Sequence, residues 1–257
     1  MTDWWDYHLI DFLLFSTRVY YRLFASFNLA FWPVNLALYL AGAGLVVLVL
    51  RSGTGAGADR QRWLCRLVPV ILALMWAWSG AVFMGYYYQP INWAVPYVLP
   101  LFGFETLMLA VFAVRKTPLQ FCWRGDFSSM AGVALLVLAI PVYPFFSLFS
   151  GRDMMAAELF GSAPDPTMIG TLGLLLLARG TWRWILLPAP VLWCLITSLT
   201  LWAMDQDIAW LPLVAAWLAI LGGWMDAKSG VTRKPVATPP GRLNSTHHQT
   251  DKVGFIE

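Results

Sequence analysis

The chain has 257 residues, of which 59% are hydrophobic and only 12% are charged. A soluble domain carries roughly a quarter charged residues, so this composition excludes an ordinary soluble protein. Several continuous apolar runs are present, each near the length of about 20 residues that crosses a bilayer as a helix. The sequence therefore predicts an all-α fold, a polytopic transmembrane helical bundle whose first partner is the lipid bilayer.

The N-terminal segment, residues 1–28, is rich in aromatic residues and also carries Asp6, Asp11, Arg18 and Arg22. Its apolar residues recur at roughly helical spacing, which favours an amphipathic helix that lies in the membrane interface. An ordinary helix packed on the membrane domain is the alternative interpretation.

The predicted membrane domain covers residues 29–226, and the polar, proline-containing segment 227–257 is predicted to be a disordered tail. Six long apolar runs are predicted spans: 29–50, 67–88, 93–114, 130–149, 182–203 and 208–225. A seventh run, residues 167–178, is only about three helical turns long and follows a turn that contains two prolines.

The distribution of basic residues decides how this short run is counted. If it crosses the membrane, the loops on one side hold 14 of the 17 Lys and Arg residues. Cytoplasmic loops carry an excess of Lys and Arg, so this count favours seven spans. We expect a bacterial inner-membrane protein with the N-terminus outside and the C-terminus in the cytoplasm.

The turn before the short helix contains the first candidate site. Asp165 or Thr167 can cap the helix, and Pro166 suits its first turn. A helix of about 12 residues reaches only about 18 Å, so the turn at 160–167 must enter the membrane shielded by protein. An acid at this helix start suits a cation better than an anion, and a purely structural cap is the alternative.

Glu105 is the second candidate because it is the only acid within a predicted span. A charge at mid-span is costly, so Glu105 should face the bundle interior with a partner. A proton or cation site with Asn35, Tyr88 and Gln89 nearby is one hypothesis, and a protonated carboxyl that serves packing is the other. We expect Glu105, Asp165 and the aromatic end of the second span to converge in the outer half of the bundle.

No catalytic residue, metal site or cofactor is predicted. The three cysteines, Cys65, Cys122 and Cys194, lack the spacing of a zinc site or of a disulfide framework. No predicted span contains a histidine, and no P-loop, nucleophile elbow or zinc-protease motif is present. The sequence favours a non-enzymatic protein, and no nucleic-acid partner is expected.

Four stretches carry a family resemblance: FNLAFWPVN at 27–35, WAWSGAVFMGYYYQPIN at 76–92, and the segments 143–177 and 186–208. They resemble an uncharacterised family of bacterial multi-pass membrane proteins, catalogued as a domain of unknown function. Its most specific element is the P-x-P-T-x-x-x-T-x-G-L-L-L pattern that starts at Pro164. The resemblance implies a multi-pass membrane protein without an established activity, and it implies a cysteine where this chain has Asp165. If the thiol of that cysteine is the functional group of the family, this chain lacks it. If the position only requires a helix cap, Asp165 can provide it.

Two functions follow from these observations. The chain shows no internal repeat of the kind that many transporters contain, which favours a scaffold or accessory subunit bound to other membrane proteins. The alternative is a small transporter or permease that moves a proton, a cation or a small solute through a site near Glu105 and Asp165.

Overall fold

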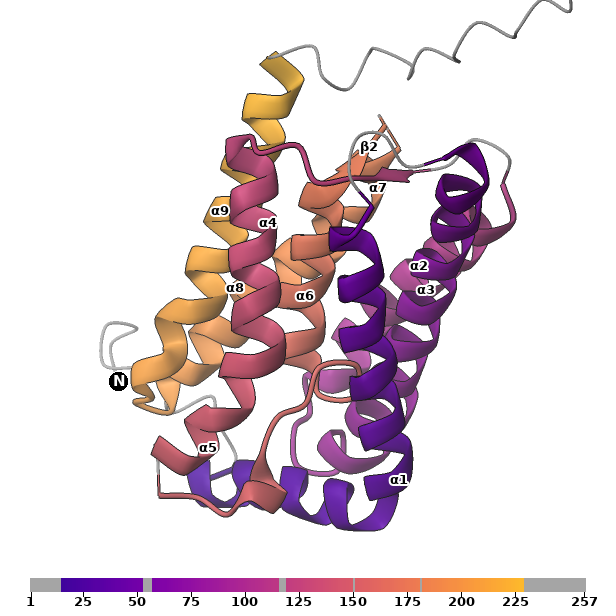
Figure 1. Ribbon diagram of the computed structural model, residues 1–257. Helices are drawn as coiled ribbons and strands as arrows, with labels where there is room; N and C mark the ends of the chain where they lie inside the picture. The colour runs from indigo at the N-terminus through magenta and orange to yellow at the C-terminus, as the bar shows by residue number, and fades with distance from the viewer. Residues whose placement is uncertain (1–14, 53–56, 116–118, 150, 181, 229–257) are drawn as a thin grey trace, which may run out of the picture.

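The computed structural model describes residues 15–52, 57–115, 119–149, 151–180 and 182–228, which form a bundle of helices (Figure 1). The α-helices are α1 (Thr17–Leu50), α2 (Ala58–Trp78), α3 (Val95–Val114), α4 (Phe127–Val137), α5 (Phe146–Phe149), α6 (Pro164–Leu177), α7 (Arg183–Leu186), α8 (Pro188–Ala203) and α9 (Trp210–Lys228). Two π-helical segments, η3 (Ser79–Tyr88) and η4 (Leu138–Val142), continue α2 and α4. Short 3₁₀ turns are η5 (Tyr143–Phe145), η6 (Met154–Ala156) and η7 (Asp207–Ala209), and the strands β1 (Gln120–Phe121) and β2 (Ala178–Arg179) pair antiparallel.

Among the described residues, six helical stretches are long and apolar enough to cross a membrane: Thr17–Leu50, Asp59–Tyr88, Val95–Val114, Phe127–Phe149, Arg183–Ala203 and Asp207–Lys228. The predicted helical bundle with several membrane-compatible helices is confirmed at this level. The short run is α6, which has 14 residues and is not one of the six. Its status as a seventh span stays a prediction.

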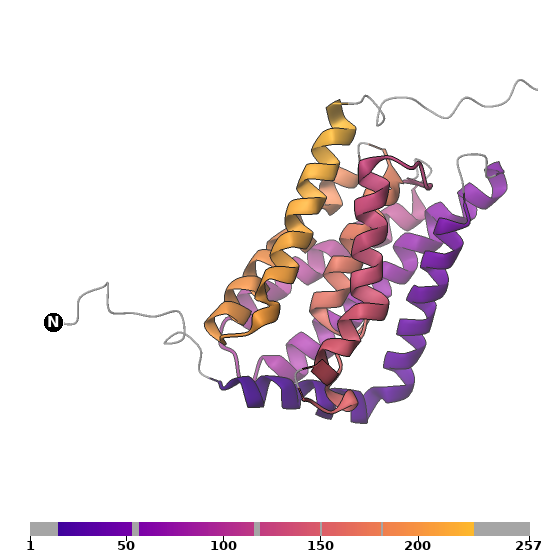
Figure 2. The ribbon, with the colours of Figure 1, turned by 60° about the vertical axis from the view of Figure 1, so that its left-hand side comes forward.

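Helix α1 bends at Phe31, whose φ of −124° and ψ of 22° are not helical. Pro33 follows closely, and a proline inside a helix removes a backbone N–H and crowds the preceding turn. The first arm of α1, residues 17–30, therefore lies across one end of the bundle, which we name the arm end (Figures 1 and 2). Residues 1–14 of the predicted interfacial segment lie outside the described residues, and the place of the first arm in a membrane interface stays a prediction.

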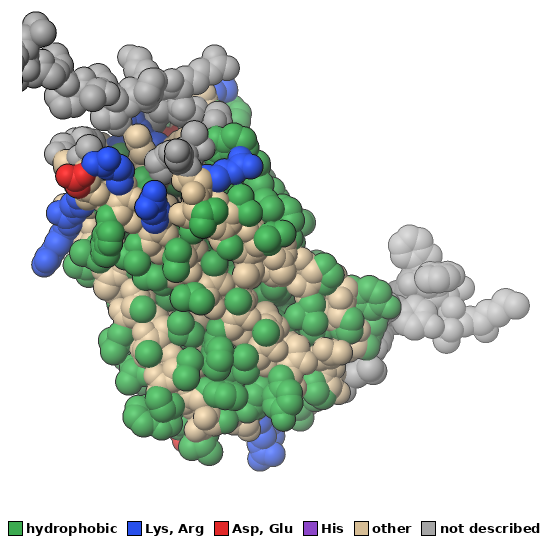
Figure 3. All heavy atoms as spheres, turned by 90° about the vertical axis from the view of Figure 1, so that its right-hand side faces the viewer, with side chains coloured by type: hydrophobic (Ala, Val, Ile, Leu, Met, Phe, Trp, Pro, Cys, Tyr) green, Lys and Arg blue, Asp and Glu red, His purple; other side chains and the backbone are tan. Residues whose placement is uncertain are grey.

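The loops of the bundle are divided between the arm end and the opposite end. Hydrogen bonds from the first arm to the carbonyls of Met155, Ala157 and Met204 place the loop before α6 and the turn after α8 at the arm end. The β1–β2 pair joins the start of α4 to the end of α6 at the opposite end. In the face shown in Figure 3, basic side chains gather mainly at the opposite end and hydrophobic ones cover the middle. The assignment of these ends to the two sides of a membrane stays a prediction.

Several element boundaries differ from those predicted; α6, for example, begins at Pro164 and not at residue 167. Helix α2 begins at Ala58, so much of the predicted loop at 51–66 is helical. The second span is not a continuous α-helix, because its last ten residues form the π-helical η3. Helix α9 continues to Lys228, inside the predicted tail, and residues 229–257 of that tail lie outside the described residues.

Helix α6 occupies the centre of the bundle, and all 14 of its residues are buried. It packs against α4, α8 and α9, and α4 lies closest to it (Figure 1). A Cβ added to Gly173 would lie 2.8 Å from the backbone oxygen of Gly132, and one added to Gly132 would lie 2.8 Å from the backbone oxygen of Gly173. These two glycines let the backbones of α4 and α6 touch, as small residues do in membrane bundles.

The variant Gly173→Ala is expected to lower the free energy of unfolding by about 1–3 kcal/mol, because the added methyl group has no room between α4 and α6. Thermal unfolding in a mild detergent measures the change. Gly44→Ala is the matched control, because nothing lies within 4 Å of its added Cβ. Equal melting temperatures for Gly173→Ala and the wild type would contradict the close approach.

Candidate functional site

The N-terminal end of α6 begins inside the bundle, where unpaired backbone N–H groups are costly. Pro164 and Pro166 occupy two of the first three helical positions and have no N–H to satisfy. The hydroxyl of Thr167 donates to the carbonyl of Ala163 and accepts from the N–H of Gly161. The whole turn at 160–167 is buried, as the sequence led us to expect. The motif thus lets a helix start away from water with few unpaired donors.

Asp165 lies in the first turn of α6, and the prediction that Asp165 or Thr167 caps the helix is wrong, because the N-cap residue is Ala163 and no side chain caps this end. Its carboxyl group instead accepts hydrogen bonds from Trp193 Nε1 at 2.8 Å, from Thr197 Oγ1 at 2.9 Å and from the Tyr143 hydroxyl at 3.3 Å. Asp165 is only 2% exposed. Three donors from neighbouring helices hold it, and none of the ion pairs among the described residues includes it.

A second buried acid, Glu158, lies in the loop that precedes α6. Its Oε1 is 3.9 Å from Nη1 of Arg152, and the Arg152 guanidinium stacks 3.5 Å from the ring centre of Tyr21. Burial raises the pKa of the Glu158 carboxyl, the negative charge of Asp165 adds to this, and the charge of Arg152 opposes it. The cluster therefore buries two carboxyl groups beside one guanidinium.

A small cavity of about 70 Å³ adjoins Asp165. Trp193 and Thr197, which hold the Asp165 carboxyl, line it together with Tyr20 from the first arm and Tyr88 at the end of η3. At roughly 30 Å³ for each water, the cavity has room for about two waters or for one small cation without its full hydration shell. Tyr88 therefore lies near the residues that hold Asp165, but Asp165 itself does not line the cavity.

Glu105 is fully buried in α3, as predicted, but without the predicted partner. Neither of its carboxyl oxygens has a hydrogen-bond partner among the described residues. Among the described residues, no hydrogen bond or ion pair joins Glu105 to Asp165. The structure therefore leaves Glu105 as a separate buried acid near the middle of α3.

The other predicted site residues do not join the Asp165 cluster. Asn35 is buried, donates to the side chain of Asn28 and accepts from the indole of Trp78, so it braces the bend of α1. Gln89 is exposed in the turn after η3. Thr167 serves the backbone of the turn before α6.

The residues that hold Asp165 were not predicted from the sequence. Trp193 and Thr197 are four positions apart, and this spacing indicates that they lie on one face of α8. The spacing does not indicate which residue that face contacts. Tyr143 follows the second π-helical segment, and no feature of the sequence around it indicated a contact with Asp165. Within the described ranges, no group of three or more His, Cys, Asp or Glu side chains is placed to hold a metal ion.

The C-terminal end of α6 is also enclosed, and a second charged cluster satisfies its carbonyl groups. Arg124 donates to the last two carbonyls of the helix at 3.2 and 3.4 Å, and Arg183 donates to the carbonyl of Ala178 at 3.0 Å. Both guanidinium groups meet Oδ2 of Asp226 on α9, at 3.1 and 2.7 Å. Cations at this position also offset the negative end of the helix dipole. We name these three residues, Arg124, Arg183 and Asp226, the lock of α6.

Asp126 connects this lock to the start of α4. It accepts a hydrogen bond from Nε of Arg124 at 2.6 Å and caps α4 through the N–H of Ser129. Burial acts against ionisation, but hydrogen bonds from Arg124 and Ser129 and the charge of Arg124 outweigh it and lower the pKa of the Asp126 carboxyl. Asp126 is therefore ionised at neutral pH.

The variant Asp226→Asn is expected to lower the free energy of unfolding by about 3–5 kcal/mol, because it leaves the buried guanidinium of Arg183 without a carboxylate, while Arg124 keeps Asp126. Thermal unfolding of the purified protein in detergent measures the loss. Asp59→Asn is the control, because the side chain of Asp59 is 93% exposed beside Arg62, and exposed pairs contribute little. A comparable loss in both variants would contradict the lock.

A comparison with known protein families matches residues 17–224 to a family of unknown function, DUF6064. No curated protein and no solved structure matches the chain. The matched range includes α6, the whole Asp165 cluster and the two arginines of the lock. Because the match covers most of the 257 residues, the chain belongs to this family of proteins of unknown function.

Proposed function

We propose that this protein is a membrane transporter that binds a proton or a small cation at Asp165 and moves it, alone or with a small solute, across the bilayer. The observation that supports this proposal is the charge balance of the cluster. Asp165 and Glu158 are both buried, and Arg152 is the one basic group that pairs with either of them in the described part of the chain. A buried carboxylate without a counter-charge is costly, and a bound proton or cation removes that cost.

The chemistry around Asp165 favours a cation over an anion. The cavity beside the cluster has four hydroxyl-bearing side chains among otherwise mainly apolar lining residues: Tyr20, Tyr88, Thr197 and Thr200. Hydroxyl and carboxyl oxygens are hard ligands that suit small cations, and they also exchange protons. The carboxyl group of Asp165 would repel an anion at the same place.

Glu158 places part of the acidic cluster next to the surface. Arg152 lines an open depression at the arm end and pairs with Glu158. No hydrogen bond among the described residues joins Glu158 to Asp165, but the charge of Asp165 helps to raise the pKa of the Glu158 carboxyl, so the two acids influence each other. Glu105, buried near the middle of α3 without a hydrogen-bond partner among the described residues, is another buried acid, apart from this cluster.

Asp165→Asn is expected to abolish binding of the proton or cation, because it removes the carboxyl group. The fold should be kept, because the hydroxyls of Tyr143 and Thr197 can accept hydrogen bonds from the new amide. The wild type should lose thermal stability as pH rises from the ordinary to the raised pKa of Glu158, because its folded state retains a proton that the unfolded state releases. Alkali cations added at high pH should restore that stability. Asp165→Asn should reduce the pH response, because the charge of Asp165 adds to the effect of burial on the pKa of Glu158, and it should abolish the cation response. It should also stop cation-dependent proton flux in proteoliposomes that contain a pH-sensitive dye.

Asp205→Asn serves as the matched control, because Asp205 is an exposed acid at the same end of the bundle. Glu105→Gln tests whether Glu105 takes part in proton flux. If Asp165→Asn keeps the pH response, the cation response and the flux of the wild type, the transport proposal is wrong.

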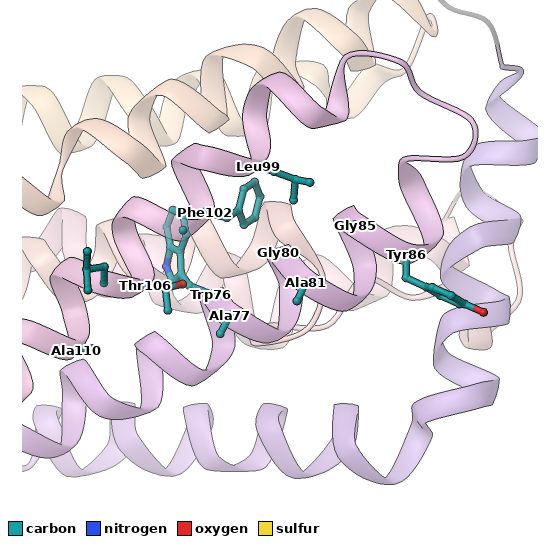
Figure 4. A pocket seen from close by; sticks show the side chains of 12 residues that line it. Trp76, Ala77, Gly80, Ala81, Gly85, Tyr86, Leu99, Phe102, Thr106 and Ala110 are labelled. Carbon is teal, nitrogen blue, oxygen red and sulfur yellow. The ribbon is translucent and has the colours of Figure 1, made fainter.

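A scaffold role is the second candidate, and a surface groove favours it. The groove, of about 770 Å³, lies between α3 and the helix formed by α2 and η3 (Figure 4). Ala77, Ala81 and Gly85 line one wall at intervals of four residues, and Gly103 and Ala110 line the other. Small residues at this spacing let a second membrane helix approach closely. In this role, the groove would receive a helix of a partner subunit.

Ala81→Leu and Gly103→Leu are expected to fill the groove and to reduce stoichiometric co-purification of a partner subunit by roughly tenfold or more, since the helices no longer approach. Affinity purification from mild detergent measures the effect. Gly44→Leu is the control, because Gly44 has open space around it and lies on α1, outside the groove. The scaffold role is excluded if no stoichiometric partner is found, or if the partner remains when the groove is filled.

A further inference from the structure

A second depression, of about 510 Å³, opens at the arm end of the bundle. Arg18, Arg22 and Arg152 line it, and Asp153 is the one acid in its lining. These three arginines are all the basic residues that the described part of the arm end contains. The arm end therefore concentrates its positive charge in a single concave place.

Two of the three arginines are free to bind a ligand. Arg18 and Arg22 are four residues apart on the same face of the first arm, and both are exposed. Neither forms a hydrogen bond or an ion pair with another described residue. Arg152 is fixed between the Tyr21 ring and Glu158. Planar guanidinium groups arranged around a depression suit the oxygens of a phosphate group, which they bind with paired hydrogen bonds.

The walls of the depression are held together by contacts between distant parts of the chain. The Tyr21 hydroxyl donates to Gln206 Oε1 at 3.1 Å, and Thr17 Oγ1 donates to the Met204 carbonyl at 3.4 Å. The carboxyl of Asp153 accepts from the N–H of Met155 at 3.0 Å, so part of its capacity as an acceptor is already used. The depression is thus formed by the folded bundle before any ligand binds.

Exposed aromatic side chains indicate the depth of this depression in a membrane. Tyr86, Trp93, Tyr97, Trp202 and Trp210 are all exposed and lie near the helix ends on this side of the bundle. Amphipathic aromatic rings prefer the level of the lipid headgroups. The arginines therefore lie where the phosphates of a bilayer lie, which favours a lipid over a free phosphate ion.

We propose that the depression binds the phosphate group of an anionic phospholipid, with Arg18 and Arg22 as the contacting residues and Arg152 behind them. Basic residues beside a membrane gain affinity from anionic lipids. The depression shares Arg152 with the acidic cluster proposed above for transport, but Arg18 and Arg22, the contacting residues, do not belong to that cluster.

The test uses the full chain in nanodiscs of phosphatidylcholine with or without phosphatidylglycerol. The wild type should retain phosphatidylglycerol in preference, as measured by native mass spectrometry, and should melt at a higher temperature when this lipid is present. Arg18→Gln combined with Arg22→Gln should lower the preference by roughly tenfold or more. Arg51→Gln combined with Arg66→Gln, which removes the same charge from exposed residues at the opposite end, should leave the preference unchanged.

Three outcomes would overturn the proposal. The first is no preference in the wild type, and the second is an equal loss in both double variants, which would indicate diffuse attraction to the membrane. The third is an equal rise in melting temperature from inorganic phosphate alone, which would indicate a free ion as the ligand. Arg18→Lys combined with Arg22→Lys, which keeps the charge, should restore part of the preference. The response of the wild type to alkali cations should persist in all these variants, so the outcome is separate from that of the transport proposal.

Discussion

The structure depends on the enclosure of both ends of α6. A helix leaves four N–H groups and four carbonyl groups unpaired at its termini, and water usually satisfies them. Here, Pro164 and Pro166 reduce the number of N–H groups at the start, while Arg124 and Arg183 bind the carbonyls at the end. The helix can be short because protein, and not water, meets its ends. The glycine contact with α4 then brings the surrounding helices close enough to enclose it.

The same enclosure creates the acidic site. In a helix that spans the full bilayer, an acid in the first turn lies at headgroup level beside water. In α6 the first turn lies inside the bundle, so Asp165 is held at depth by Tyr143, Trp193 and Thr197. Neutral donors can stabilise a carboxylate but supply no positive charge, and Glu158 adds a second acid nearby. The buried start of α6 thus accounts for both the polar shell around Asp165 and its unmet charge.

Much of this fold could be predicted from the sequence, because contact with lipid requires long apolar runs. The long helices follow those runs, and the shortness of α6 with the turn before it correctly indicated a buried start. What could not be predicted depends on distant contacts. Capping is a local rule, but the donors that hold Asp165 are up to 32 residues away, and the Arg183–Asp226 pair spans 43 residues. The π-helical end of the second span has no sequence signature that distinguishes it from an α-helix.

Basic residues have different physical roles at the two ends, and this bears on how charge is interpreted in membrane proteins. Arg124 and Arg183 count toward the excess of positive charge that favours a cytoplasmic assignment, yet Asp226 and Asp126 pair with them. The exposed arginines at that end, such as Arg51 and Arg66, are the ones that can respond to the membrane during insertion. At the arm end, the described basic residues all line one depression, so their position reflects the local packing of the arm as well as any preference for one side of the membrane. A charge count therefore indicates topology best when buried, paired arginines are separated from exposed ones.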